Sequence, residues 1–172
     1  MTQKQQTQRD EMLEALRQQL VPMMKSRGFS NRQPSPQKRA SAEWRRAFPL
    51  GDFERRDGEN LQLVEVQVDI NGAPRFVLNV GVAPPEGVTL PWGFFEQSDL
   101  SVSSLTNAFR LYSAPRWQRW FGPGVLTFGR ARRAGNSVKD AMSVFHEIEE
   151  WFIAGTVGKH MRRFGRPADE RA

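Results

Sequence analysis

The chain contains no cysteine among its 172 residues, so disulfides, thiolate zinc sites and cysteine nucleophiles are excluded. It has two histidines, which leaves little material for imidazole-based chemistry, and one tyrosine. No apolar run reaches the roughly 20 residues that a membrane span needs, and residues 1–9 lack the apolar segment of a signal peptide. These absences predict a cytoplasmic protein without a membrane partner.

Acidic residues are missing from one long segment. Residues 100–136 carry six arginines and no Asp or Glu, whereas residues 41–99 carry ten acids against five bases. The net charge of the whole chain is +6. A basic segment can attract nucleic acid or an acidic partner, but it can equally lie against the acidic middle of its own chain. Both interpretations stay open at the level of sequence.

The most regular pattern lies in Leu61–Val82, where two runs place apolar residues at every second position, as half-buried strands do. The apolar members are Val64, Val66, Val68, Ile70, Phe76, Leu78, Val80 and Val82. Residues 71–74, Asn-Gly-Ala-Pro, suit a hairpin turn because Asn and Gly tolerate positive φ. We expect even-numbered side chains of both strands to face helices and odd-numbered ones to face solvent or a partner.

Two amphipathic helices are predicted on either side of this hairpin. The first begins at Asp10, kinks or restarts at Pro22 and ends at Gly28. The second begins at Asn136 or Ser137, where Ser137 and Asp140 resemble a capping box, and weakens at Gly155 and Gly158. Its apolar stripe comprises Val138, Met142, Phe145, Ile148 and Phe152, while Glu147 and Glu150 are expected to face away from it.

The predicted fold class is α+β: an antiparallel meander sheet with the N-terminal and C-terminal amphipathic helices packed on one face. One domain spans residues 10–165, with disordered tails at 1–9 and 166–172 and a mobile loop at about 30–42. Short strands at 44–48 and 53–56 are expected to lead into the hairpin. The topology of residues 84–135 is left open by the pattern.

The predicted elements follow one another in a set order. A leading helix ends in Gly28-Phe29, and a loop comes next. After it come a strand with Val66-Gln67 and a strand reading Phe76-Val77-Leu78-Asn79-Val80-Gly81-Val82. This order resembles a bacterial family known as domain of unknown function 4304, over about residues 10–83. The resemblance implies an α+β domain and supplies no established catalytic residue.

Catalytic motifs find no support in the sequence. His146 and Glu150 are four residues apart on a predicted helix and could share a metal, but the second histidine of a zinc-binding HExxH motif is missing. The carboxylates Glu147, Glu149 and Glu150 are better explained as a charged helix surface than as acid–base groups. We therefore predict no catalytic, cofactor-binding or metal-binding residue.

Binding residues are predicted on two features. Gln67, Arg75 and Asn79 should leave the same face of the hairpin, opposite Val66 and Val80. The other feature is an arginine-rich segment with interleaved aromatic residues, whose cations are Arg116, Arg119, Arg130, Arg132 and Arg133. Our leading hypothesis is a module that recognises another protein through both features. The alternatives are a nucleic-acid-associated protein, because cations and aromatics can grip phosphates and stack on bases, and an enzyme without a recognised motif.

Overall fold

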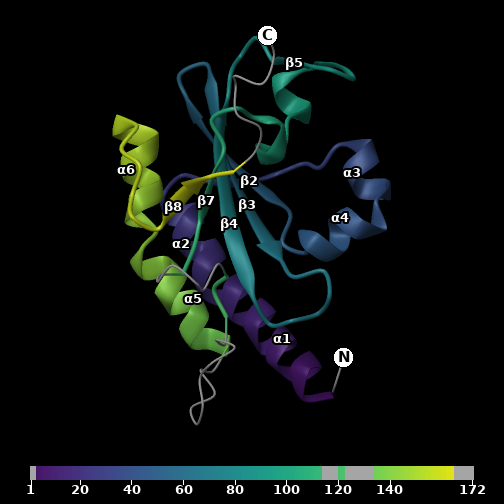
Figure 1. Cartoon of the computed structure of the whole chain (residues 1–172), viewed down its shortest axis with the longest axis vertical. Helices are drawn as coiled ribbons and strands as arrows, with labels where there is room; N and C mark the ends of the chain where they lie inside the picture. The colour runs from purple at the N-terminus through teal and green to yellow at the C-terminus, as the bar shows by residue number, and fades with distance from the viewer. Residues whose placement is uncertain (1–2, 114–119, 123–133, 165–172) are drawn as a thin grey trace.

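The computed structural model describes residues 3–113, 120–122 and 134–164. Within these ranges a six-stranded antiparallel sheet runs through the middle of the molecule, in the order β1-β2-β3-β4-β7-β8 (Figure 1). Its strands are β1 (Ser30–Arg32), β2 (Asp52–Asp57), β3 (Asn60–Val68), β4 (Phe76–Ala83), β7 (Phe109–Leu111) and β8 (Met161–Arg163). Helices near both ends of the described chain pack against the sheet, which confirms the predicted α+β class and its antiparallel meander.

The first helical segment covers more of the chain than expected. It consists of α1 (Gln3–Ala15), a π-helical turn (Leu16–Leu20) and α2 (Val21–Ser26). The prediction of a disordered tail at 1–9 is wrong from Gln3 onward, because α1 begins there and Arg9 donates a hydrogen bond of 2.7 Å to the carbonyl of Asp69, just after β3. The restart at Pro22 is confirmed, since a proline ring cannot continue the regular i−4 ladder and the wider π turn precedes it.

The C-terminal helix is divided in two, α5 (Ala134–Ser143) and α6 (His146–Ala154). The expected capping box is wrong, because Ser137 lies inside α5 and its buried Oγ has no hydrogen-bond partner in the described structure. Glu147 does not face away either: its carboxylate is buried and accepts hydrogen bonds from the backbone N–H and ring Nδ1 of His160 at 2.8 and 2.5 Å. Gly155 was expected to weaken the helix, and α6 does end there, with Gly155 in the left-handed conformation.

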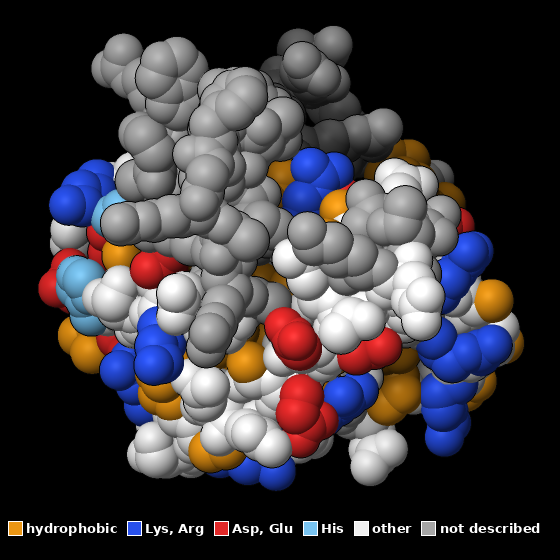
Figure 2. All heavy atoms as spheres, turned by 90° about the horizontal axis from the view of Figure 1, so that it is seen from below, with side chains coloured by type: hydrophobic (Ala, Val, Ile, Leu, Met, Phe, Trp, Pro, Cys, Tyr) orange, Lys and Arg blue, Asp and Glu red, His pale blue; other side chains and the backbone are white. Residues whose placement is uncertain are grey.

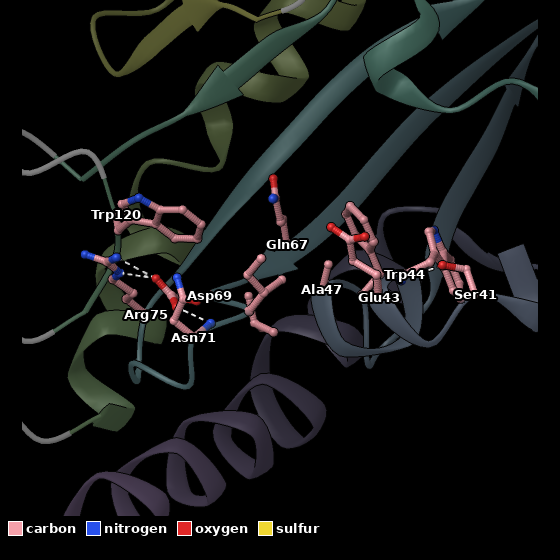
Figure 3. A pocket seen from close by; sticks show the side chains of 12 residues that line it. Ser41, Glu43, Trp44, Ala47, Gln67, Asp69, Asn71, Arg75 and Trp120 are labelled. Atoms are coloured by element: carbon pink, nitrogen blue, oxygen red, sulfur yellow. Dashed lines mark hydrogen bonds and ion pairs between the residues drawn. The ribbon is translucent and has the colours of Figure 1, made fainter. Parts of the chain in front are cut away.

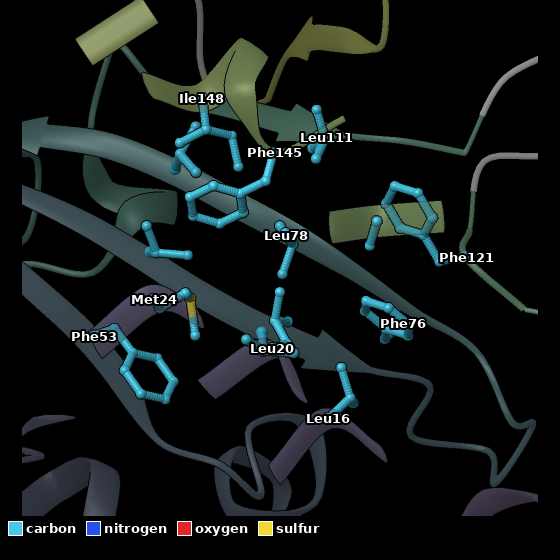
Figure 4. Packing of buried hydrophobic residues seen from close by; sticks show 14 of the residues in the cluster. Leu16, Leu20, Met24, Phe53, Phe76, Leu78, Leu111, Phe121, Phe145 and Ile148 are labelled. Atoms are coloured by element: carbon cyan, nitrogen blue, oxygen red, sulfur yellow. The ribbon is translucent and has the colours of Figure 1, made fainter. Parts of the chain in front are cut away.

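The main core lies between the sheet and these four helices (Figure 4). Most even-numbered residues of the hairpin form its floor, as the alternation predicts: Val64, Val66, Val68, Phe76, Leu78 and Val80 are fully buried. The prediction is wrong for Ile70, which follows the end of β3 and is 46% exposed. The helices contribute Leu16, Leu20 and Met24 from one side and Phe145 and Ile148 from the other. Val66 and Val80 therefore face both terminal helices, and the predicted packing on one face is confirmed.

The segment expected to be a mobile loop at 30–42 is structured. It contains β1 and two short helices, α3 (Pro36–Ala40) and α4 (Ala42–Ala47). Ser35 and Ser41 cap the helices by accepting hydrogen bonds from the backbone N–H groups of Lys38 and Trp44. Residues 44–48 are accordingly helical over most of their length, so the prediction of a strand there is wrong.

The second face of the sheet is also covered, so the prediction that odd-numbered side chains of the hairpin face solvent or a partner is wrong over most of its length. Residues 84–108 fold back over the odd-numbered side chains with a two-stranded hairpin, β5 (Val88–Leu90) and β6 (Gly93–Phe95), and two 3₁₀ turns, Gln97–Asp99 and Val102–Ser104. Leu61 and Leu63 of β3 pack against Leu100, Val102 and Leu105 in a second core. This segment does not cover the end of the face near the β3–β4 turn, where Gln67 is partly exposed.

Candidate functional site

A row of polar side chains crosses the odd-numbered face from one edge of the sheet to the other. Its members stand directly opposite one another in the register of six strands: Arg32, Asp52, Glu65, Asn79, Arg110 and Arg162. The first four are at most 7% exposed. Buried polar groups are stable only where hydrogen bonds or opposite charges compensate the loss of water. The hydrogen-bond and ion-pair partners of these side chains therefore show which segments of the chain cover the row.

Glu65 is the most strongly perturbed member of the row. Its pKa is raised to about 7: burial is the main cause and the neighbouring carboxylate of Asp52 adds to it, while the charges of Lys38 and Arg32 and a hydrogen bond from the backbone N–H of Val102 oppose the rise. That hydrogen bond is 3.0 Å long. Asp52 is joined to Lys38 of α3 at 2.6 Å. The same pair of carboxylates thus fastens two covering elements to the sheet.

Arg32 binds residues 97–100 of the segment 84–108, which covers this face of the sheet. Its guanidinium donates to the carbonyl oxygens of Gln97 (2.8 Å), Ser98 and Leu100 (2.5 Å), and it pairs with Glu54 at 3.3 Å. A guanidinium has a planar set of donors that suits several acceptors at once. Residues 97–102 are therefore fixed to the sheet by Arg32 and Glu65 together, and this part of the polar row is structural rather than open to a ligand.

Asn79 was predicted to line an exposed surface, and this prediction is wrong: the residue is 1% exposed. Its side chain instead links two neighbours. The Oε1 atom of Gln67 accepts hydrogen bonds from Asn79 Nδ2 (3.1 Å) and Arg110 Nη2 (2.8 Å), and Asn79 Oδ1 accepts one from Arg110 Nε (2.7 Å). Arg110 lies 3.9 Å from the ring centroid of Phe164, and burial lowers its pKa. This network fixes the side chain of Gln67.

Gln67 opens onto a pocket of about 550 Å³ at the uncovered end of the face. One wall is formed by residues 41–48 of α4 and its flanks, and the other by residues 67–71, Arg75 and Trp120. Figure 3 shows Trp120, Arg75 and Asp69 on one side, with Glu43 and Trp44 on the other and Gln67 between them. We call this site the α4 pocket. It places polar groups between aromatic walls, an arrangement typical of binding sites.

The predicted residue Arg75 lies in this pocket but is not free. Its Nε and Nη2 atoms bind Asp69 Oδ2 at 2.6 and 2.5 Å, and its guanidinium carbon lies 5.2 Å from the ring centroid of Trp120. The other oxygen of Asp69 accepts a hydrogen bond of 2.7 Å from the backbone N–H of Asn71. The ion pair therefore stiffens the hairpin turn and holds Trp120 in the pocket wall.

Exposed cations border the pocket on α3 and α4. Arg39, Arg45 and Arg46 are exposed, and Lys38 lies 5.8 Å from the ring centroid of Trp44. Figure 2 shows Lys and Arg side chains gathered at the right, the side on which these two helices lie in Figure 1. The predicted residues Arg116, Arg119, Arg130, Arg132 and Arg133 lie outside the described residues. The structure thus places a basic border beside the pocket from helices that were expected to be loop or strand.

Metal-binding geometry is not found in the part of the chain that the structure describes, where no group of three or more His, Asp and Glu side chains is able to hold an ion. His146 is exposed and its Nδ1 lies 3.0 Å from the carbonyl of Ser143. Within the same ranges, no helix is both long and apolar enough to cross a membrane.

Sequence reasoning missed three residues that define the site: Glu43, Trp44 and Arg110. The sequence does contain a signal for the helix that carries Glu43 and Trp44, since Ser41 followed by Ala-Glu-Trp is typical of a helix start with an acid in the first turn. Arg110 carries no such signal, because its role depends on β7 pairing with β4, from which residues 84–108 separate it in sequence.

The fold and the site together define a small α+β protein with an antiparallel sheet, and within the described residues a polar and aromatic pocket lies at one end of the face that residues 84–108 cover. Comparison of the chain with protein-family models, with curated proteins and with solved structures finds no match. The resemblance noted over residues 10–83 stays a prediction.

Proposed function

We propose that the chain is a binding module that recognises another protein through the α4 pocket. The observation that carries this proposal is the preassembled pocket itself, in which Trp44 and Trp120 supply apolar surface and Gln67 supplies a fixed amide. Aromatic side chains contribute large contact areas at low entropic cost and dominate the energetics of protein recognition. The wall residues are tied to the sheet on both sides, so binding requires little reordering.

The partner is expected to insert a side chain rather than to add a strand to the sheet. β3, which carries Gln67, and β4, which begins directly after Arg75, are inner strands of the sheet, since β3 lies between β2 and β4 and β4 lies between β3 and β7. The pairing of β3 with β2 ends at Glu65, and α4 contacts β3 on the side of the pocket. The open part of the odd-numbered face offers side chains and the concave surface of the pocket, which suits a protruding residue of the partner.

Selection of peptides against the whole chain tests this proposal. Peptides recovered from a displayed library should bind the wild type and lose at least about tenfold in affinity with Trp44→Ala, as expected for a central aromatic anchor. Because Trp44 stacks on Phe48 at 5.7 Å, a second variant, Ile70→Glu, changes a pocket residue that is 46% exposed and should not disturb folding. Trp92→Ala, at a 65% exposed tryptophan outside the pocket, is the matched control and should leave affinity unchanged. Selected peptides that bind both pocket variants as tightly as the wild type would overturn the proposal.

Nucleic-acid binding is the second candidate, and the basic border of α3 and α4 beside Trp44 favours it. Cations next to an exposed aromatic ring can contact phosphates while a base stacks. This binding should weaken steeply as salt is raised, because each neutralised phosphate releases counterions. Failure to retain single-stranded DNA or RNA at about 50 mM salt would exclude this candidate, whereas the peptide affinities should change far less over the same salt series.

A further inference from the structure

We propose that the α4 pocket selects a cationic side chain, arginine or lysine, of its protein partner, with Glu43 as the charge that recognises it. This inference rests on the proposed function, because it names the chemistry of the residue that enters the same pocket. It is carried by the charges of the pocket wall, by the orientation of Gln67 and by the apolar surface between them.

The charges of the pocket do not cancel. Asp69 and Arg75 neutralise each other through two short contacts at 2.6 and 2.5 Å. Glu43 is exposed and forms no ion pair or hydrogen bond with any described residue. Among the described residues that line the pocket, Glu43 is therefore the charged group without an ion-pair partner, although the protein as a whole carries +6.

Cations on the same helix do not supply that missing partner. Arg45 is turned towards α3, where its Nη1 donates to the carbonyl of Arg39. Arg46 lies three residues after Glu43, a spacing that permits an ion pair on a helix, yet the two form none in the described structure. Glu43 instead faces the pocket across from Gln67, as Figure 3 shows.

The amide of Gln67 presents a defined polarity to the pocket. Its Oε1 atom is engaged by Asn79 and Arg110, so the Nε2 group is the part that is available as a hydrogen-bond donor. A donor at this position fits a backbone carbonyl of the partner, and the carboxylate of Glu43 fits the head group of the same residue. Asn79 and Arg110 act as positioning residues for this contact.

Apolar surface connects these two polar groups. Trp44, Ala47, Phe48 and Ile70 all line the pocket, and they suit the methylene stem of a long basic side chain. A volume of about 550 Å³ accommodates such a side chain together with the flanking backbone. An acidic side chain would instead approach the unpaired carboxylate of Glu43, and a short polar one would leave the apolar walls uncovered.

Capped single residues test the charge selectivity directly. The probes are N-acetyl-arginine methylamide, the corresponding lysine compound and the citrulline compound, which is a neutral isostere of arginine. Binding is followed on the whole chain through the indole N–H signals of Trp44 and Trp120 in proton–nitrogen NMR spectra. We expect arginine to bind about fivefold more tightly than citrulline, and Glu43→Gln to remove that preference. Glu96→Gln changes an exposed carboxylate outside the pocket and should retain it.

The contribution of Gln67 is separable from that of the charge. Gln67→Ala should weaken the arginine and citrulline probes by the same factor, because both present the same backbone carbonyl.

Equal affinities of the two probes for the wild type, or an arginine preference that survives Glu43→Gln, would overturn the inference. If selected peptides depend on Trp44 but contain no preferred Arg or Lys, the cation inference alone fails. If no selected peptide depends on Trp44 or Ile70, the proposed function itself fails.

Discussion

Replacement of Glu65 by glutamine should stabilise the protein at high pH and have little effect at low pH. Glu65 is 3% exposed, and its neighbours across the strands are Asp52 and Asn79. Burial, reinforced by Asp52, raises the pKa of the carboxyl from the ordinary value of 4.5 to about 7. The folded protein therefore binds the Glu65 proton more tightly than the unfolded chain does, which makes folding favour the protonated acid.

The size of the effect follows from this difference in pKa. At about 1.4 kcal/mol for each pKa unit, a pKa of about 7 against 4.5 corresponds to about 3 kcal/mol. This stabilisation is fully present below pH 4.5 and is lost as the pH rises through about 7. Glutamine stays neutral at every pH, keeps an oxygen for the N–H of Val102 and offers an N–H near Asp52 Oδ1, a buried atom without a partner in the described structure.

Urea unfolding at several pH values between 4.5 and 8.5, followed by tryptophan fluorescence, measures this prediction. The free energy of unfolding of Glu65→Gln minus that of the wild type should be near zero at pH 4.5 and rise to about 3 kcal/mol at pH 8.5. Glu86→Gln removes an exposed carboxylate of the covering segment and should change stability by less than about 0.5 kcal/mol at both ends of the range. A difference that does not vary with pH, or a glutamine variant that is less stable at pH 8.5, would refute the reasoning.

Three further predictions concern packing and buried hydrogen bonds, and chemical denaturation measures all three. Gly158→Ala should destabilise the protein by about 1–3 kcal/mol, because the added carbon would lie 2.6 Å from the Cβ of buried Glu147, whereas Gly135→Ala, with nothing within 4 Å, is a control that should not destabilise it. Phe76→Ala should cost about 3–5 kcal/mol by opening a cavity in the main core. Asn79→Ala should cost about 1–3 kcal/mol through unpaired partners, and a loss below about 0.5 kcal/mol would show that the residue does not organise the buried network.

Local pattern was sufficient for the elements that bury one face. The alternation in β3 and β4 correctly placed Val66 and Val80 against the terminal helices, because a strand with one apolar face has a single way to bury it. The ends of the helices at Gly28 and Gly155 were also predictable, since a left-handed helix terminus favours glycine for local steric reasons.

The covering of the second face could not be deduced in the same way. Glu65 and Asn79 occupy polar positions in an alternating pattern, and such positions ordinarily face solvent. They are buried because Val102 and Arg110, which are distant in sequence, provide their hydrogen-bond partners. A sequence window records the polarity of a side chain but not the partner that compensates its burial.

The sequence by itself determined the α+β class, the central hairpin and the packing of both terminal helices on its apolar side. Only the tertiary structure decided that residues 84–108 close most of the other side and that α4 stands beside the hairpin turn. The physical reason is that hydrophobic alternation is a local property of the chain, whereas the α4 pocket depends on contacts between segments far apart in sequence. Gln67 could thus be predicted in advance as a candidate surface residue, but Glu43 could be placed in the same pocket only once the chain was folded.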